Sequence, residues 1–412
     1  MAGDRSTMDA ALKNLYLPRL QSTINVKRIL MSRLEKNASS RSVSGRQAIV
    51  PINIRPSEAI GARGDGEALP TPQNQVYVEC SIPYRYLYAT IRVTHPTIAS
   101  TKNDEGAWIR VISAEMDGIS RDMKNDFNRQ LHGDGTGKLG KTTSGHSGTD
   151  TTIEVLTGHR IKANMLIDGW GGTMNGGDTK TLDGVTVSSV AANVITLSAA
   201  ATWDSGDYLT RKGVTDASPA TAVYHEMMGI LGIADDGTYV DTLQGITRLG
   251  GSGYPEWKSQ VFANGGTARE ITEADLDDSL LQIEEQAEGD ISIGLTSRTQ
   301  FRKIANLMVP DRRYSDSMEL NGGFKAINWA GTPIAWDRDM QIDENGNDWL
   351  AWLDESQLSL YEMADWNWDD EDGDILHRNQ GYATYDATLY KYCNLGTMDA
   401  GNHGAIRDLS RS

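Results

Sequence analysis

The segment DEGAWIRVISAEMDGISRDMKNDFNRQL, residues 104–131, carries one long apolar stripe. Its steps of three and four residues match the 3.6-residue period of an α-helix, not the two-residue period of a strand. The stripe consists of Trp108, Ile112, Met116, Ile119, Met123, Phe127 and Leu131. Charged residues fill most of the other faces, and glycines at 133, 135 and 137 mark the expected helix end. Burying these side chains is worth on the order of 10 to 20 kcal/mol, so we expect a long surface helix with one covered face.

The composition is that of an ordinary globular protein. The chain has 412 residues, of which 39% are hydrophobic and 23% charged, and this length suits about two or three domains. Cys80 and Cys393 do not form a disulfide framework, so we expect folding in a reducing cytoplasm. The N-terminus holds no apolar signal core, and no window approaches 18 unbroken apolar residues. We therefore expect neither secretion nor a membrane partner.

The net charge of −17 is unevenly distributed. Residues 1–50 contain nine bases and three acids, a balance of +6 that leaves −23 for the remainder. Two interpretations of this basic arm stay open. It can lie on acidic surfaces of its own or a neighbouring subunit, or it can contact nucleic acid phosphates. The acidic charge of the whole chain argues against a dedicated DNA-binding protein.

Two arms are expected ahead of the long helix. Residues 7–37 have roughly helical apolar spacing, broken or kinked at Pro18. The region 47–98 favours strands, with β runs at 48–54 and 76–94 around a Gly- and Pro-rich loop. This predicts a two-stranded arm with a wide tip. Because an isolated ribbon is marginally stable in water, the arm packs on its own domain or, as we expect, reaches over a neighbouring subunit.

After a Gly/Ser/Thr-rich linker at 138–150, residues 151–213 predict a compact β unit. The expected strands are 152–156, 161–167, 185–190, 194–197 and 208–211, with turns at 168–172 and 175–178. Five short strands favour a small barrel inserted between larger parts of the chain.

From about residue 217 the pattern is mixed α and β. The capping pairs Thr272 with Asp275 and Ser297 with Gln300 predict two helices, with a strand at 291–296 between them. The strands expected after them are 334–336 and 349–353, joined through Asn345-Gly346, then 358–368 and 375–392, joined by the acidic turn 369–374, and finally 405–409.

Motifs for cofactor and metal sites fail at their spacing. Gly135, Gly137 and Gly140 match G-x-G-x-x-G, but a dinucleotide-binding loop leaves a strand and this one leaves a helix. The carboxylate runs 343–348 and 369–374 lack a glutamate at the twelfth position of an EF-hand calcium loop, so we interpret both as turns. The tripeptide Arg63-Gly64-Asp65 is interpreted as a loop tip.

Catalytic patterns are also missing. The seven histidines show no paired metal-ligand spacing, and no serine lies in G-x-S-x-G. Alternating tryptophans could line a sugar-binding site, but their placement on predicted strands favours a core role. These are Trp329, Trp336, Trp349, Trp352, Trp366 and Trp368. We predict no enzyme, no catalytic residue, no cofactor-binding residue and no metal site.

Four segments, in this order, resemble the tailed-bacteriophage major capsid protein family with the Hong Kong 97-type fold. They are NDFNRQLHGDGTG (125–137), LQGITRLGGSGYPEW (243–257), GGFKAINWAGTPIAWD (322–337) and YKYCNL (390–395). Their shared positions are shape-bearing Gly, Pro and aromatic residues rather than a catalytic signature. The likeness covers nearly the whole chain.

The resemblance implies an α+β fold of seven parts. These are an N-terminal arm (1–46), a long β-hairpin E-loop (47–94), a P-domain with the spine helix (95–150), an inserted small β-barrel (151–213), a mixed α/β A-domain (217–354), P-domain return strands (355–395) and a closing A-domain segment (396–412). The implied function is a structural major capsid protein that self-assembles into hexamers and pentamers of an icosahedral phage head around double-stranded DNA. Its implied location is the virion capsid, assembled in the host cytoplasm. The implied partners are the chain itself, a portal, scaffolding or decoration proteins, and packaged DNA held by non-specific contacts.

Two features depart from the family pattern. Some members crosslink subunits through an E-loop lysine and a P-domain asparagine, but no lysine lies between Lys36 and Lys102, so we expect no isopeptide crosslink. The β unit is an insertion relative to the minimal fold, and we expect it to contact adjacent subunits and stabilise the shell. Two alternatives stay open: an encapsulin-like shell of a bacterial protein compartment, and a carbohydrate-binding or hydrolytic protein with a carboxylate pair such as Asp365 and Asp369.

Overall fold

The structure of this chain is a computed structural model, whose described residues include one short helix of the N-terminal arm. It describes residues 28–36, 40–42, 45–96, 105–158, 160–172, 179–216, 223–251, 253–286, 290–308, 318–320, 324–340, 342–343, 345–370 and 373–411. The helical arm expected at 7–37 lies outside these residues except for α2 (Ile29–Lys36). Leu30, Met31 and Leu34 of α2 are buried in the main core, as an amphipathic helix requires.

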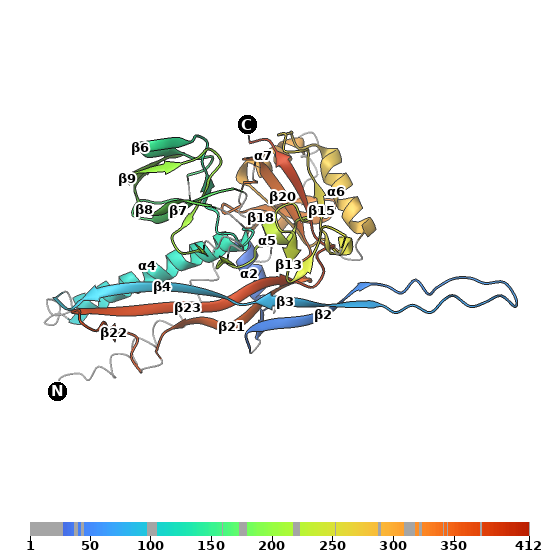
Figure 1. Ribbon diagram of the computed structural model, residues 1–412, viewed down its shortest axis with the longest axis horizontal. Helices are drawn as coiled ribbons and strands as arrows, with labels where there is room; N and C mark the ends of the chain where they lie inside the picture. Colours follow the sequence, from blue (N-terminus) through green and yellow to red (C-terminus); the bar gives the residue numbers. More distant parts are fainter. Residues whose placement is uncertain are drawn as a thin grey trace.

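The predicted long helix is α4 (Glu105–Leu131), which lies along a sheet of long strands (Figure 1). Its stripe faces inward: Met116, Met123, Phe127 and Leu131 are buried. The Phe127 ring meets the edge of Trp366 on that sheet, with ring centroids 5.4 Å apart. Trp108 and Ile112 have side chains outside the described part of the helix. The helix and its covered face are thus confirmed over its C-terminal half.

The sheet under α4 has the order β1-β21-β23-β22, with β4 pairing to β23 as well. Its strands are β1 (Ser40–Ser42), β4 (Arg85–Thr94), β21 (Leu358–Trp368), β22 (His377–Arg378) and β23 (Thr384–Thr397). The strand pairing with β21 was expected at 375–392, but the antiparallel partner is β23, which starts nine residues later. Part of the intervening segment forms the two-residue strand β22, which pairs with β23 instead.

The arm expected at 47–94 belongs to two sheets, so the single long strand predicted at 76–94 is wrong. The strands β2 (Gln47–Arg55) and β3 (Val76–Pro83) form a two-stranded antiparallel ribbon. After Tyr84 the chain enters β4, which pairs along its length with β23. Pro83 has no N–H to continue the ladder, and its carbonyl instead accepts a hydrogen bond from the Asn394 side chain at 2.7 Å.

Residues 140–211 form a β unit above α4 (Figure 1) with its own apolar core. Its sheet order is β5-β10-β7-β8-β9-β6. The strands are β5 (Gly140–Lys141), β6 (His146–Glu154), β7 (Leu166–Gly171), β8 (Thr179–Ala191), β9 (Val194–Trp203) and β10 (Tyr208–Arg211). The N–H of Leu156 donates to the carbonyl of Lys141 at 2.9 Å, which also links the two ends of this order.

Three expectations for this unit are wrong. The strand predicted at 161–167 begins only at Leu166, the first residue of β7. The linker predicted at 138–150 contributes β5 and the start of β6, and the turn predicted at 168–172 is mostly strand β7. Gly169 explains the last of these errors: a Cβ there would lie 2.9 Å from Leu182, so the glycine permits close packing rather than a turn. The turn expected at 175–178 lies outside the described residues.

The remaining domain is built on a seven-stranded mixed sheet with the order β15-β24-β20-β16-β19-β18-β17. The strands are β15 (Gln260–Phe262), β16 (Ile293–Thr296), β17 (Met318–Leu320), β18 (Phe324–Trp329), β19 (Thr332–Trp336), β20 (Asp348–Leu353) and β24 (Gly404–Leu409). The expected turn at Asn345-Gly346 does not make a hairpin, because β16 lies between β19 and β20. The expected closing strand at 405–409 is β24.

Both predicted capped helices are confirmed. In α6 (Glu273–Gln286), the Thr272 hydroxyl accepts from the N–H of Asp275, and the Asp275 carboxylate accepts from the N–H of Thr272. In α7 (Arg298–Leu307), the Ser297 hydroxyl accepts from the N–H of Gln300. These bonds satisfy amides that the first turn leaves without partners. The shorter elements are β11 (Thr215–Asp216), β12 (Val223–Tyr224), α5 (Ile230–Ile233), β13 (Thr242–Leu243), β14 (Ile246–Thr247) and the 3₁₀ helix η1 (Pro255–Trp257).

The main core joins α2, α4, the ribbon root and the mixed sheet. Four of the six tryptophans weighed as a sugar site are buried, namely Trp349, Trp352, Trp366 and Trp368, whereas Trp336 is 40% exposed. The glycines after α4 take left-handed conformations, with φ of 84° at Gly135 and 83° at Gly137, and turn the chain toward β5. Among the described helices, none has both the length and the apolar character that a membrane crossing requires.

Candidate assembly surfaces

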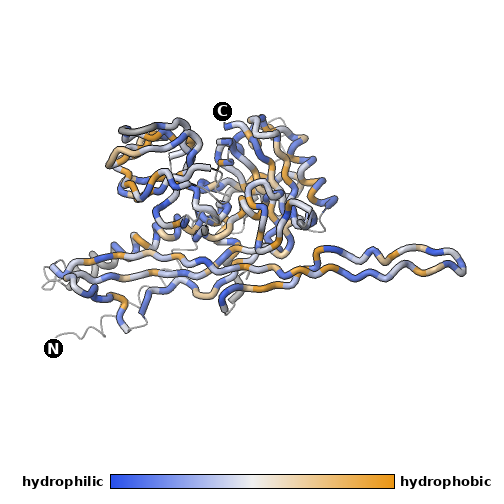
Figure 2. Tube along the Cα trace, viewed as in Figure 1, coloured by the Kyte–Doolittle hydropathy of each residue, from blue (hydrophilic) through white to orange (hydrophobic). Residues whose placement is uncertain are grey.

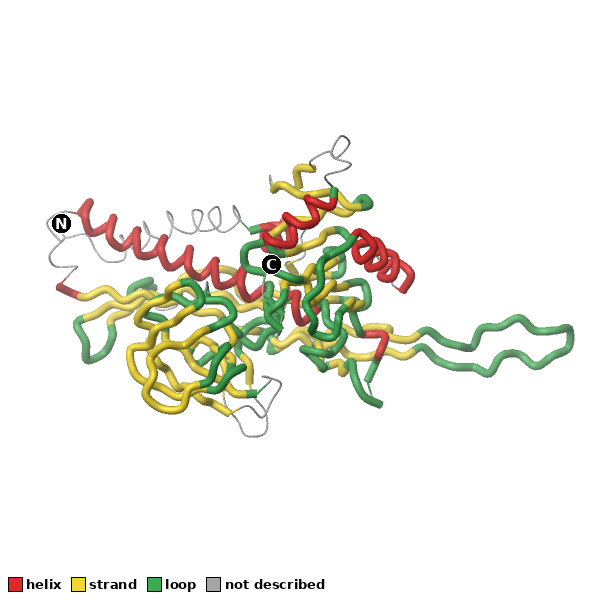
Figure 3. Tube along the Cα trace, turned by 90° about the horizontal axis from the view of Figure 1, so that it is seen from above, coloured by secondary structure: helices red, strands yellow, loops and turns green. Residues whose placement is uncertain are grey.

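The first exposed surface is the ribbon, which we define as β2, β3 and the loop 56–75 that joins them (Figure 3). Its root is fixed to the body. The N–H of Ser81 donates to the carbonyl of Gln244 at 2.8 Å, and Arg55 donates to the Glu256 carboxylate while stacking 5.5 Å from the Tyr254 ring. On one ribbon face Ala48, Cys80 and Ile82 are buried. The ribbon therefore leaves the body in a defined direction.

The ribbon also carries exposed apolar side chains on its strands and in its loop. Ile49 and Tyr77 are 54% and 66% exposed, and Ile60 and Leu69 in the loop reach 87% and 85%. Figure 2 shows apolar stretches continuing along the projecting part. Uncovered apolar side chains concentrated on one projection mark an interaction surface rather than scattered exposure. The ribbon is thus suited to pack on another molecule.

The loop 56–75 has local order despite lacking strands. The Glu67 carboxylate accepts from the N–H of Gly64 at 3.0 Å, and Arg63 Nε donates to the carbonyl of Ala68 at 3.1 Å. The tripeptide beginning at Arg63 therefore lies in a turn near the end of the ribbon, as a loop tip predicts.

A second exposed surface consists of tyrosines on β4 and β23. Tyr86 and Tyr88 are 52% and 59% exposed, and both rings meet Tyr392 edge-on at centroid distances of 5.0 and 5.7 Å. The Tyr88 hydroxyl donates to the Tyr392 hydroxyl at 3.1 Å. Burial, followed by this hydrogen bond, raises the pKa of Tyr392, so this phenol is neutral near pH 7. Neutral aromatic side chains with polar tips are enriched at protein interfaces.

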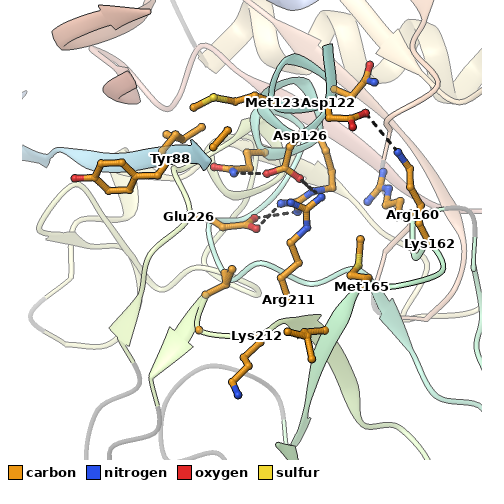
Figure 4. Close-up of a pocket in the computed structure, with 18 of the residues that line it drawn as sticks. Tyr88, Asp122, Met123, Asp126, Arg160, Lys162, Met165, Arg211, Lys212 and Glu226 are labelled. Atoms are coloured by element: carbon orange, nitrogen blue, oxygen red, sulfur yellow. Dashed lines mark hydrogen bonds and ion pairs between the residues drawn. The ribbon is translucent and has the colours of Figure 1, made fainter. Parts of the chain in front are cut away.

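A cleft of about 1170 Å³ lies between α4, β4 and the β unit (Figure 4). Its wall holds a buried ionic network. Arg129 donates to Asp126 at 2.9 Å and to Glu226 at 2.9 Å, and Arg211 pairs with Asp126 at 3.0 Å. Burial raises the pKa of Asp126, but Arg129 and Arg211 outweigh it and lower the value to about 2. Because Arg211 belongs to β10 and Asp126 to α4, the network fastens the β unit to the long helix.

The same cleft holds a cation that lacks a carboxylate partner. Arg160 donates to the backbone carbonyl of Asp339, and its Nε is buried without a hydrogen-bond partner. Burial, together with repulsion from Arg129, lowers the pKa of Arg160 to about 10. Lys and Arg also outnumber Asp and Glu on the wall of this cleft, in a chain of net charge −17. The cleft is therefore locally basic.

Candidate catalytic groups do not gather into a site. Asp365 of the proposed carboxylate pair instead accepts from Lys391 at 3.0 Å. His403 is buried, and its Nδ1 accepts from the N–H of Asp354. Burial raises the pKa of the Cys80 thiol to about 12, which keeps it a weak nucleophile. In the described part of the chain, no cluster of three or more His, Cys, Asp or Glu is arranged to hold a metal.

Two bases of the basic N-terminal arm lie among the described residues and have acidic partners. Arg33 pairs with Glu355, and Arg28 lies 3.9 Å from Asp339. These bases therefore lie on acidic surface of their own chain, the first of the two interpretations. The cleft and the tyrosine cluster were missed because they combine segments far apart in sequence. The sequence did offer a signal for the cluster, because two expected strands carry tyrosines at alternating positions, namely Tyr86, Tyr88, Tyr390 and Tyr392.

At the sequence level, no protein-family model and no curated protein matches the chain. In three dimensions it is similar to a chain of the cyanophage A-1(L) capsid asymmetric unit, with 13% identity, a TM-score of 0.54 and 90% of each chain covered. Similarity to the capsid of a native GTA particle has 12% identity, a TM-score of 0.47 and coverage of 93% and 92%. Similarity to a chain of the holo-SrpI encapsulin complex from Synechococcus elongatus has 9% identity, a TM-score of 0.45 and coverage of 90% of this chain and 85% of that chain.

The cyanophage likeness extends over nearly the whole chain and shows a shared fold. The α+β architecture expected from the resemblance, the Hong Kong 97-type capsid fold, is thereby confirmed. At 13% identity the likeness establishes the fold alone, because one fold can host several functions.

Proposed function

We propose that this chain is a major capsid protein that assembles into hexamers and pentamers of an icosahedral phage head. The observation that carries this proposal is the ribbon: a projection anchored at its root, with Ile60 and Leu69 almost fully exposed, on the fold of a capsid subunit. A monomer gains nothing from holding such side chains in water. A shell subunit buries them once per neighbour, and repetition of one contact builds a closed assembly.

The parts of the fold take the following roles in this proposal. The ribbon is the E-loop and covers a neighbouring subunit, α4 with its long sheet is the P-domain, and the seven-stranded sheet with α6 and α7 is the A-domain. The β unit is an inserted small barrel that contacts adjacent subunits. The function is structural, without catalysis. The ribbon contains no lysine, so it cannot supply the lysine of a lysine–asparagine crosslink.

The partners follow from the same proposal. Packaged double-stranded DNA is contacted non-specifically, which the acidic net charge and the self-paired bases Arg28 and Arg33 support. A portal and scaffolding or decoration proteins complete the particle, which assembles in the host cytoplasm. A capsid wall encloses DNA of any sequence, so it does not require base-specific contacts.

The decisive experiment compares the full-length chain with a ribbon-shortened variant. Residues 57–74 contain no strand and are replaced by Asn-Gly, which can close a two-residue turn. We expect negative-stain electron microscopy and sizing to show shells or capsomers for the full chain. The variant should keep the circular dichroism and melting of the full chain but elute as a smaller species.

The control for this comparison is Arg63→Ala, which alters the ribbon end without removing Ile60 or Leu69 and should assemble normally. A full chain that stays monomeric at every concentration and salt tested would overturn the capsid proposal. Shells formed equally well by the ribbon-shortened variant would overturn the role given to the ribbon.

A further inference from the structure

The strand β4 lies at an edge of the long sheet. Among the described strands it pairs with β23 alone, over all ten of its residues, and this ladder contains no bulge. Its second edge therefore presents backbone N–H and C=O groups that no strand of the described chain uses. Proteins usually protect such an edge with proline, lysine or a bulge, but the sequence of β4, RYLYATIRVT, contains neither proline nor lysine. The edge is thus able to pair with a further strand.

The cleft between α4, β4 and the β unit runs along this edge. Four consecutive residues of β4, from Tyr86 to Ala89, line it. Successive side chains of a strand point to opposite faces of its sheet, so a cleft that meets four residues in a row meets the strand at its edge. Figure 4 shows Tyr88 on one side of the cleft and Lys162 on the other. The cleft volume of about 1170 Å³ exceeds the roughly 300–1,000 Å³ of small-molecule sites, which leaves room for a peptide segment.

The rest of the cleft wall is both apolar and basic. Ile119 of α4 and Met165 and Leu166 of the β unit supply apolar surface, and Leu166 is 45% exposed. Six of the lining side chains are Lys or Arg and four are Asp or Glu. Arg160 donates to a backbone carbonyl instead of a carboxylate, and Lys212 is exposed. A segment that complements this wall carries carboxylates alternating with apolar side chains.

We propose that β4 accepts an extended acidic peptide of another protein as an added strand in this cleft. Backbone hydrogen bonds to β4 supply the affinity, and the bases and apolar side chains of the wall select the sequence. The loop 56–75 of a second copy does not suit this role, because its three prolines and three glycines weaken strand pairing. The proposal does not rest on the capsid assignment, since the cleft lies within one chain.

The test is fluorescence polarisation of a labelled peptide of alternating valine and glutamate, titrated with the full-length protein. Valine favours the extended conformation, and glutamate supplies the carboxylates that the basic wall selects. We expect saturable binding of about one peptide per chain. Binding should weaken as salt is added, because part of the attraction is between exposed charges. Absence of saturable binding at low salt would overturn the proposal.

Two control peptides separate the sources of affinity. The same peptide with lysine in place of glutamate tests charge complementarity and should bind at least about tenfold more weakly. Methylation of every backbone nitrogen removes the donors that an added strand needs on either of its edges, so it should abolish saturable binding. If the methylated peptide binds as tightly as the unmethylated one, the peptide is not an added strand.

Two exposed lysines of the cleft test where the peptide binds. The double variant Lys162→Glu and Lys212→Glu reverses charge on the wall without touching a buried side chain. It should keep the circular dichroism of the full chain and bind the valine–glutamate peptide about tenfold more weakly. Arg298→Glu with Arg302→Glu makes the same charge change at exposed positions of α7 and should leave binding unchanged. Equal losses in both double variants would contradict binding in the cleft.

Sizing of the protein with and without peptide distinguishes another protein from a second copy of this chain. Saturating peptide should leave the oligomeric state unchanged, and the Lys162 and Lys212 variant should self-associate as the full chain does. If the peptide breaks up assemblies, or if this variant alone fails to assemble, the cleft is a contact between copies and the assignment to another protein is wrong. A chain that binds the peptide and stays monomeric supports this proposal and contradicts the capsid assignment alone.

Discussion

His403 shows how burial fixes the charge of a single residue. Its side chain is fully buried, Nδ1 accepts from the N–H of Asp354 at 3.3 Å, and Nε2 lies 2.9 Å from the Thr397 hydroxyl. Burial, with a smaller effect of Arg248, lowers its pKa from 6.5 to about 3. The folded chain therefore keeps this imidazole neutral over a pH range in which the unfolded chain protonates it.

This shift predicts acid sensitivity. Below pH 6.5 the unfolded state binds a proton that the folded state refuses until about pH 3, so stability falls as the pH drops through that window. Between pH 6.5 and 4.5 the loss should be about 2–3 kcal/mol. Urea unfolding at both pH values measures it. His403→Gln, which retains a donor and an acceptor without titrating, should lose less stability; an identical pH dependence would refute the assignment.

Single residues were the hardest level to predict from sequence. Lys391 looks like a surface base on an alternating strand, yet it is fully buried between Glu362 and Asp365, 5.1 Å from the Trp366 ring. Asp343 looked like part of a turn, which it is, but its relation to Asp408 depends on tertiary contacts 65 residues away (408 − 343). The sequence pattern around each residue does not indicate which distant residues it contacts.

At the scale of elements, α4 could be predicted because a long periodic stripe specifies a helix without reference to its partners. The capped helices followed for the same reason, since Thr272 and Asp275 satisfy each other's backbone amides locally. Strand partners could not be predicted as well. β16 separates β19 from β20, and β4 leaves the ribbon for β23, because pairing is chosen by the whole sheet rather than by the nearest turn.

Gly118 offers a direct test of the helix assignment. It lies inside α4, and a Cβ built on it would meet nothing within 4 Å. Gly118→Ala should therefore stabilise the chain by about 0.5–1 kcal/mol, because alanine loses less conformational entropy in a helix. Chemical denaturation of the full chain gives the difference. Gly229→Ala is the matched contrast: its Cβ would lie 2.4 Å from the Gln130 carbonyl, so it should destabilise.

At the scale of the whole molecule, the β unit is built as a removable part. Its apolar core is separate from the main core, and the chain enters and leaves it side by side: a Cβ on Gly137 would lie 2.5 Å from Val214. The unit is nevertheless tied to α4 through Arg211 and Asp126. The main apolar core therefore does not include this unit, and the role proposed for it lies in the assembly.

Replacing residues 139–213 by two glycines should leave the remaining domains folded, because Asp126 keeps its partner Arg129. If the unit stabilises the shell as proposed, particles of this variant should disassemble at a lower temperature than those of the full chain. Light scattering during heating measures this, and circular dichroism of the dissociated subunits controls for misfolding. If particles of the variant and of the full chain disassemble at the same temperature, the unit does not stabilise the shell.

The strand β23 has a mechanical consequence for the subunit. It pairs with β21 over one edge and with β4 over the other, and its 14 residues run alongside α4 (Figure 1). Antiparallel hydrogen bonds lie perpendicular to their strands. A force pulling the two ends of this sheet apart therefore shears many of these bonds at once, instead of opening them one after another. The sheet therefore resists stretching along the direction in which α4 also runs.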